Sequence, residues 1–200
     1  VYDVEPGDVL YVDTGVYTNT SAVEFGRLDS GSTSSTVRII GSTNTCGLGS
    51  VMVSTNQSSG SYGLRLYYAL GLALSNLTFT RAHTGVRMEN TVQATLGNIR
   101  SLGNSSHGFE VSVSSNILFQ RIVAMTNGGY AFVSGTNANT RILQSVLWSN
   151  TAGSVYLTGG SLDVSNTVHY ANGSGRYIYD IAGATLKSDY NDLFTTNNAY

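Results

Sequence analysis

A repeat of about 22 residues constrains the fold of this chain more than any other feature. Short segments recur in which a glycine precedes an alternating pair of apolar residues. The glycines of these segments are Gly63, Gly85, Gly108, Gly129, Gly153 and Gly175. They lie 22, 23, 21, 24 and 22 residues apart. A period of this length, kept over many repeats, predicts a solenoid in which similar turns stack on one another.

Each repeat holds about three short strands. A second series of alternating segments runs in register with the first, and its members begin at Leu74, Leu96, Phe119, Leu143 and Val164. Such alternation is typical of half-buried strands, and no segment shows the 3.6-residue apolar period of the helical return in a leucine-rich repeat. Glycine and small polar residues separate the strands, where we expect them to supply positive φ angles at the corners. The prediction is an all-β, right-handed, single-stranded parallel β-helix of about eight to nine turns with three strands each.

Stacked turns place equivalent residues in ladders along a solenoid. We predict one inner ladder of Leu64, Val86, Phe109, Tyr130 and Val155. We predict a second inner ladder of Leu77, Ile99, Ile122, Val146 and Val168. Arg141 falls at an expected inward position, which predicts a register shift or a bulge in its turn. The side chains predicted to form a stacked amide ladder, each bonded to the next turn, are Asn104, Asn127, Asn150 and Asn172.

The repeat indicates a single β-helix domain over residues 1–200. Residues 1–61 fit the period less well, with long polar loops between the expected strands, whereas residues 62–200 follow it closely. The sequence begins at Val1, already close to a strand-like segment, and we expect it to be part of a longer chain.

The composition favours an extracellular or cell-surface location. Charged residues make up 11% of the chain, against about 25% in an average soluble domain. A net charge of -2 without clustered Lys or Arg argues against a nucleic-acid partner, and no apolar run has the length needed for membrane insertion. Cys46 is the single cysteine, so we predict a small apolar packing role for it and no cysteine-based metal site.

Two segments resemble parts of known proteins. Residues 6–17, Pro-Gly-Asp-Val-Leu-Tyr-Val-Asp-Thr-Gly-Val-Tyr, are similar to the opening of many pectin-lyase-like right-handed β-helix domains. Residues 188–194, Ser-Asp-Tyr-Asn-Asp-Leu-Phe, resemble the closing turn of β-helix modules in large bacterial secreted and surface proteins. The resemblance implies the fold. It leaves the function open, because this superfamily includes polysaccharide lyases, glycoside hydrolases, esterases, phage tailspikes and non-catalytic adhesins.

One outward column carries the candidate catalytic residues. Arg65, Arg87 and Glu110 lie 22 and 23 residues apart and are expected on successive turns. Pectate-lyase-type members of the superfamily use an arginine or lysine base beside calcium-binding aspartates. The resemblance therefore allows a lyase reading of this column, and calcium is expected only under that reading. The alternative is a surface column in which Glu110 offsets the charge of Arg87, worth less than about 1 kcal/mol.

A hydrolase would need paired carboxylates on one sugar. The aspartates considered for this role are Asp163, Asp180, Asp189 and Asp192. We predict no shared column for the histidines, which are His83, His107 and His169.

We therefore predict a non-catalytic structural or adhesive module. Tyr67, Tyr68 and Tyr156 are the candidate glycan contacts, since their rings are flat and amphipathic. Expected partners are a polysaccharide or cell-surface glycan, neighbouring β-helix modules, or copies of the chain itself. One alternative is a polysaccharide lyase or glycoside hydrolase. A second is a subunit that stacks end to end into a filament through unpaired strand edges.

Overall fold

The computed structural model describes residues 4–43, 49–171 and 176–195. These residues form three parallel sheets. Sheet A stacks β1 (Val9–Val12), β4 (Val37–Gly41), β7 (Leu70–Ser75), β10 (Val92–Gly97), β13 (Ser115–Gln120), β16 (Asn139–Leu143), β19 (Ser161–Ser165) and β22 (Thr185–Asp189). Sheet B stacks β2 (Gly15–Asn19), β5 (Ser50–Ser54), β8 (Leu77–Thr80), β11 (Arg100–Leu102), β14 (Val123–Met125), β17 (Val146–Trp148), β20 (Val168–Ala171) and β23 (Asp192–Thr195). Sheet C stacks β3 (Val23–Phe25), β6 (Tyr62–Tyr67), β9 (Thr84–Glu89), β12 (Phe109–Ser112), β15 (Tyr130–Ser134), β18 (Gly153–Leu157) and β21 (Tyr177–Ile181).

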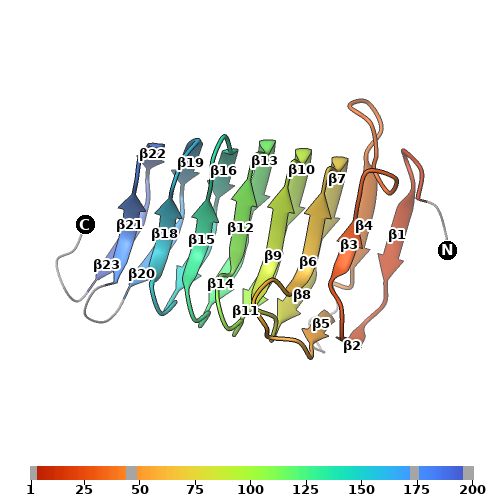
Figure 1. The fold of residues 1–200 in the computed structure, drawn as a ribbon, viewed down its shortest axis with the longest axis horizontal. Helices are drawn as coiled ribbons and strands as arrows, with labels where there is room; N and C mark the ends of the chain where they lie inside the picture. Colours follow the sequence, from red (N-terminus) through yellow and green to blue (C-terminus); the bar gives the residue numbers. More distant parts are fainter. Residues whose placement is uncertain (1–3, 44–48, 172–175, 196–200) are drawn as a thin grey trace.

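The chain visits sheets C, A and B in turn and then climbs to the next level (Figure 1). Six complete turns of three strands run from β6 to β23, and β1–β5 stack on their N-terminal side with longer loops. This confirms the predicted parallel β-helix with three strands per turn. The regular part is shorter than the eight to nine turns predicted, because the strands before residue 62 do not keep the repeat length.

The corner between sheets A and B bends at one residue per turn. These corner residues have φ between 50° and 59° and are Asn76, Asn98, Arg121, Gln144, Asn166 and Tyr190. Asparagine adopts this left-handed conformation readily, whereas the larger side chains accept a strain of roughly 1–2 kcal/mol. The bend recurs at the same place in every regular turn, so the turns stack with a constant cross-section.

Most of the repeating glycines have a different role from the one predicted. Gly63, Gly85 and Gly108 are not among the residues with positive φ. A Cβ added at Gly85 would lie 2.7 Å from the Asn104 amide nitrogen and 2.8 Å from the Gly108 carbonyl oxygen. The repeat therefore keeps glycine at these positions because the interior has no room for a side chain.

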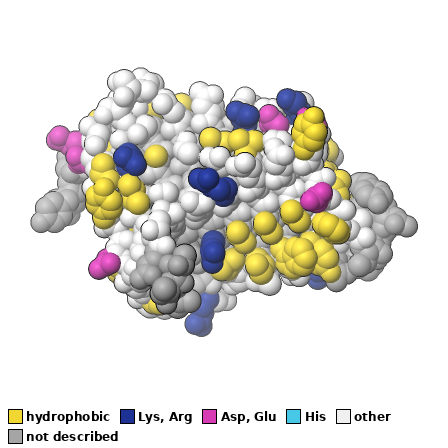
Figure 2. Space-filling view, turned by 180° about the vertical axis from the view of Figure 1, so that it is seen from behind, with side chains coloured by type: hydrophobic (Ala, Val, Ile, Leu, Met, Phe, Trp, Pro, Cys, Tyr) yellow, Lys and Arg dark blue, Asp and Glu magenta, His cyan; other side chains and the backbone are white. Residues whose placement is uncertain are grey.

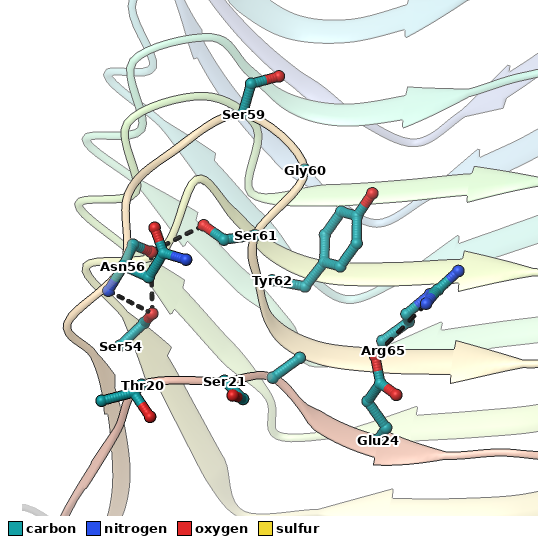
Figure 3. A pocket seen from close by; sticks show the side chains of 11 residues that line it. Thr20, Ser21, Glu24, Ser54, Asn56, Ser59, Gly60, Ser61, Tyr62 and Arg65 are labelled. Carbon is teal, nitrogen blue, oxygen red and sulfur yellow. Dashed lines mark hydrogen bonds and ion pairs between the residues drawn. The ribbon is translucent and has the colours of Figure 1, made fainter.

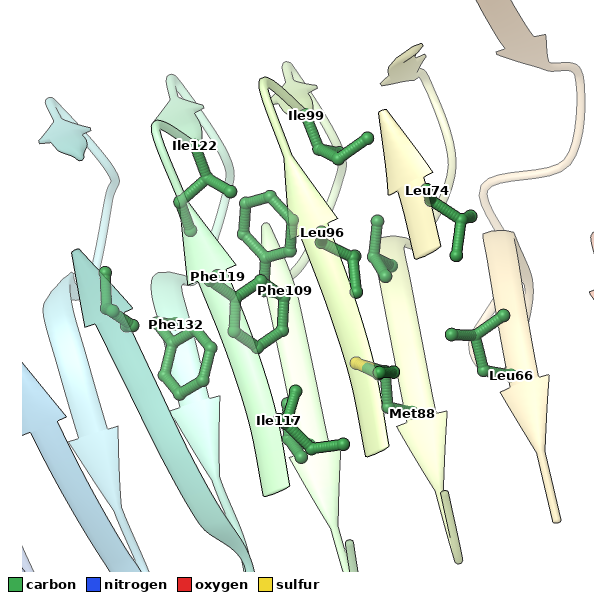
Figure 4. Packing of buried hydrophobic residues seen from close by; sticks show 14 of the residues in the cluster. Leu66, Leu74, Met88, Leu96, Ile99, Phe109, Ile117, Phe119, Ile122 and Phe132 are labelled. Carbon is green, nitrogen blue, oxygen red and sulfur yellow. The ribbon is translucent and has the colours of Figure 1, made fainter. Parts of the chain in front are cut away.

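The core fills the space between the three sheets (Figure 4). Phe119 of β13 lies between Phe109 and Phe132, with edge-to-face ring centroids 5.4 and 5.3 Å away. The sheet C inner ladder thus contains Phe132 where we predicted Tyr130, which pairs with Gly153 instead. This corrects the prediction by two residues.

The second inner ladder is also corrected. Val146 pairs with Val123, and Val168 pairs with Val146, all on the outer side of sheet B. The buried residues that continue the ladder are Ser145 and Thr167. The register shift or bulge predicted at Arg141 is not present, because β13 and β16 pair without interruption and Arg141 lies opposite Leu118 on the outer face. Thr140 takes the inner place opposite Ile117.

Buried amides line the corner between sheets B and C. The Asn104 Nδ2 donates to Asn127 Oδ1 at 2.8 Å, and the Asn127 Nδ2 donates to Asn150 Oδ1 at the same distance. Asn172, the fourth predicted member, and Cys46 lie outside the described residues. The side chains of one turn thereby tie directly to those of the next.

Within the described part of the chain, no helix is long and apolar enough to cross a membrane.

Candidate functional site

The predicted column lies on the outer face of sheet C, where the strand register brings its members together. Arg65 of β6 pairs with Arg87 of β9, and Arg87 pairs with Glu110 of β12. Neighbouring strands are about 4.8 Å apart, so these side chains form one continuous row. The whole row, read from the N-terminal side, is Glu24, Arg65, Arg87, Glu110, Val133, Tyr156 and Asp180.

Both arginines are ion-paired. Arg65 lies 3.4 Å from Glu24 Oε1 and 3.7 Å from Glu89 Oε2. Its guanidinium also stands over the Tyr67 ring, 4.4 Å from the centroid, and 5.8 Å from the Tyr62 centroid. Arg65 is therefore held in place by two carboxylates and by cation–π contact.

Arg87 is held as a cation. It pairs with Glu110, and its Nη2 lies 3.5 Å from the Ser112 hydroxyl. Burial disfavours the charged guanidinium, but the hydrogen bond and charge of Glu110 outweigh burial, so the pKa of Arg87 is raised above its usual value. A group held this firmly in its protonated form suits binding better than proton abstraction.

A polar pocket of about 250 Å³ opens at the N-terminal end of this row (Figure 3). Tyr62 and Arg65 project from one strand along its side, and Glu24 lies beside Arg65. Its other lining residues come from the connection between β2 and β3, from the last residue of β5 and from the loop after β5, and they are Thr20, Ser21, Ala22, Ser54, Asn56, Ser59, Gly60 and Ser61.

The loop that closes this pocket is fixed by its own hydrogen bonds. The Ser54 and Ser61 hydroxyls both donate to the Asn56 carbonyl oxygen, at 2.9 and 2.7 Å. The Asn56 backbone N–H donates in return to the Ser54 hydroxyl at 3.1 Å. The pocket wall is therefore formed before any ligand arrives.

The predicted glycan-binding tyrosines do not form one site. Tyr67 and Tyr68 pack edge to face, 4.4 Å apart, at the end of β6. Tyr156 lies four strands further along sheet C, roughly 19 Å away at the usual strand spacing. Its ring stacks on Tyr130 at 5.1 Å.

Tyr130 contacts two residues in the C-terminal part of the row, Tyr156 and Asp180. Its hydroxyl donates to Asp180 Oδ2 at 2.7 Å, and its backbone N–H donates to His107 Nδ1 at 3.1 Å. Burial, followed by the hydrogen bond to Asp180, raises the pKa of Tyr130, and burial lowers the pKa of His107. This cluster was not predicted, because Tyr130 was expected inside the solenoid.

The other candidate acids and histidines are scattered. Asp163 of sheet A lies 3.6 Å from Arg141 and 4.0 Å from Lys187, whereas Asp180 lies on sheet C. Asp189 and Asp192 belong to β22 and β23 on different sheets. His169 is fully buried. Across the described ranges, no three His, Cys, Asp or Glu side chains gather as metal ligands.

Several solved structures share this fold. ORF18 of Geobacillus virus E2 matches with a TM-score of 0.74 at 12% identity, over 94% of this chain and 41% of that one. An alginate lyase from Paenibacillus sp. str. FPU-7 matches at 0.58 and 12% identity, over 95% of this chain and 91% of the lyase. Pectate lyase Pel9A matches at 0.59 and 16% identity, over 97% of this chain and 70% of the lyase. The chain thus spans less than half of the viral protein, and at these identities the likeness shows a shared fold.

No curated protein matches the chain at a significant level. A family model does match, and it is the one described as the right handed beta helix region, over residues 14–169. The matched segment contains most of the sequence, with four of the six regular turns complete and nearly all of a fifth. The chain belongs to the right-handed β-helix family.

Proposed function

We propose that this chain is a non-catalytic glycan-binding module of a secreted or cell-surface protein, and that it binds its ligand along the outer face of sheet C. The observation that carries this proposal is the pocket in which Tyr62, Arg65 and Glu24 stand beside a preformed wall of hydroxyl groups. Aromatic rings pack against the apolar faces of sugars, and charged or hydroxyl side chains exchange hydrogen bonds with sugar hydroxyls.

The charges of the row favour a neutral glycan over a polyanion. The row and the adjoining Glu89 hold four carboxylates, Glu24, Glu89, Glu110 and Asp180, against the two guanidiniums of Arg65 and Arg87, which leaves two net negative charges. An acidic polysaccharide would need free cationic groups, and both arginines already have partners. Paired charges still offer donors and acceptors to uncharged hydroxyls.

A polysaccharide-active enzyme is the second candidate. The observation in its favour is that His107, Tyr130, Arg87 and Glu110 bring groups capable of acid–base chemistry to one face. The matched solved structures include proteins named as an alginate lyase and a pectate lyase. Calcium is the expected cofactor under this candidate alone.

A glycan panel separates the two candidates. Neutral and acidic oligosaccharides are titrated calorimetrically, and turnover is followed by unsaturated products and reducing ends, with calcium or with EDTA. We expect neutral glycans to bind without turnover and with little salt dependence. Arg65→Ala should weaken binding by about tenfold or more, whereas Arg141→Ala, an ion-paired arginine on sheet A, should not.

Two outcomes would contradict the proposal. Turnover that disappears in Arg87→Ala would make the protein an enzyme. Binding that is indifferent to both Arg65→Ala and Tyr62→Ala would place the ligand elsewhere. Circular dichroism of each variant checks that the fold is retained.

A further inference from the structure

The outer face of sheet B carries an apolar stripe. Two columns of side chains follow the solenoid axis there over the five strands from β11 to β23. One column consists of Leu102, Met125, Trp148, Tyr170 and Phe194. The other consists of Arg100, Val123, Val146, Val168 and Asp192. Figure 2, which shows the side opposite to that of Figure 1, displays a band of hydrophobic side chains running toward the C-terminal end.

The stripe is partly exposed in the single chain. Trp148 is 39% exposed and Phe194 is 52% exposed, and the three valines are half-buried. Contiguous apolar patches on a soluble surface mark interaction sites.

The aromatic stacking points to a protein partner. The Trp148 and Tyr170 rings lie face to face, 4.1 Å apart and 11° from parallel. These two faces are closed to a sugar ring, so the stripe presents ring edges and aliphatic groups. Such a surface suits another sheet, packed at a distance of about 10 Å.

The charges in the stripe are arranged symmetrically. Arg100 occupies one end of the valine column and Asp192 the other, and both side chains are exposed. Val146 of β17 is the midpoint, with one valine and one charged residue on either side of it. A surface with opposite charges at equal distances from its centre is complementary to itself after a half-turn.

We propose that a second copy of this chain packs on the stripe, with the two solenoids antiparallel. The two-fold axis lies in the interface between the copies and is parallel to β17. This rotation places the strands of the second copy in the reverse order opposite those of the first. Each side chain keeps its position along the strand direction. Arg100 then faces Asp192 of the second copy, twice per dimer. Val123 faces Val168 of the second copy, and Trp148 faces its own counterpart. The interface is isologous and closed, which limits assembly to a dimer.

The flanking corner agrees with this arrangement. The same rotation places Arg121 opposite Asn166 of the second copy, and Asn98 opposite Tyr190. No pair of like charges meets along this corner. Five short strands form a small face compared with those of obligate dimers, so the dimer is in equilibrium with the monomer at accessible concentrations. Sheet C stays open in both copies.

A charge-swap experiment tests the proposal. Sedimentation velocity is recorded over a concentration series for the whole chain, for Arg100→Asp, for Asp192→Arg and for the double variant. Each single reversal places like charges together twice and should weaken dimerisation by more than about tenfold. The double variant restores opposite charges and should recover the dimer. Arg141→Asp, on sheet A, is the matched control and should dimerise like the parent chain.

Fluorescence gives an independent readout, because Trp148 is the single tryptophan of the chain. Its emission should shift to shorter wavelength with the same concentration dependence as the sedimentation. The proposal is overturned by a monomer at every concentration, by a dimer that ignores both single reversals, or by a double variant as weak as the singles. A dimer that ignores both single reversals would indicate end-to-end stacking instead.

Discussion

The buried amides of the corner between sheets B and C are fully hydrogen-bonded to neighbouring turns. Asn127 is fully buried, and its Oδ1 accepts from both the backbone N–H and the Nδ2 of Asn104. Its Nδ2 donates to the Ser101 carbonyl oxygen at 3.1 Å and to Asn150. No water is needed to complete these bonds, so each amide depends on its neighbours in the turns before and after it.

Asn127→Ala should therefore be costly. It leaves donors of Asn104 and the Ser101 carbonyl without this partner, at about 1–3 kcal/mol for each buried group. We expect the free energy of unfolding in urea to fall by at least about 3 kcal/mol. Gln120→Ala is the control, because Gln120 bonds to Gln144 on the outer surface, and it should cost less than about 1 kcal/mol. Equal losses would mean that the internal ladder adds no special stability.

Residue-level prediction from the sequence succeeded where polar residues recur at a constant spacing. The predicted column of Arg65, Arg87 and Glu110 stands in one row because its spacings equal the length of a turn. The sequence could not show the partners Glu24 and Glu89. Glu24 comes from the irregular N-terminal part of the chain, and Glu89 lies on β9, two residues after Arg87.

At the scale of a strand, the uneven spacing of the glycines already indicates that they do not all belong to one column. Gly108 pairs in register with Ala131, which lies 23 residues later. Gly129 and Gly153 follow at 21 and 24 residues, and these departures show that neither belongs to the Gly108 column. Treating Gly129 as equivalent moved Tyr130 to the inside. Val146 and Val168 were misplaced for another reason: the buried positions next to them hold Ser145 and Thr167, so the more apolar residue of each pair lies on the outer face.

The inward glycines make a strand-level prediction. Gly85→Ala should destabilise the fold by roughly 1–3 kcal/mol, because the new methyl group overlaps groups of Asn104 and Gly108 in the next turn. Gly97→Ala is the control, since a Cβ at Gly97 meets nothing within 4 Å. Thermal unfolding of both variants measures the difference. A Gly85→Ala protein as stable as the Gly97→Ala protein would show that the interior can widen.

For the whole molecule, stability should depend on pH through a buried histidine. His169 lies inside the solenoid near its C-terminal end, 3.3 Å from the Tyr179 hydroxyl. Burial lowers the pKa of His169 from 6.5 to about 4. The unfolded chain therefore binds a proton between these pH values that the folded chain does not.

The free energy of unfolding should consequently be greatest above pH 6.5 and fall as the pH drops toward 4. The loss from this group is up to about 3 kcal/mol. Denaturant unfolding at several pH values measures it, and His169→Gln should remove most of the slope. His107, whose pKa is also lowered by burial, would account for the remainder. An unchanged slope in His169→Gln would show that His169 is not the titrating group.

Strand pairing joins each turn only to the turns directly before and after it. The cross-section of the rod is thus set within one turn, whereas its length is set by the number of turns. Inserting or deleting one turn would change the separation between two points on the same face by about 4.8 Å and leave the chemistry of that face in place. The distance between two binding positions on one face can therefore change only in whole turns, while the side chains of each turn keep their arrangement.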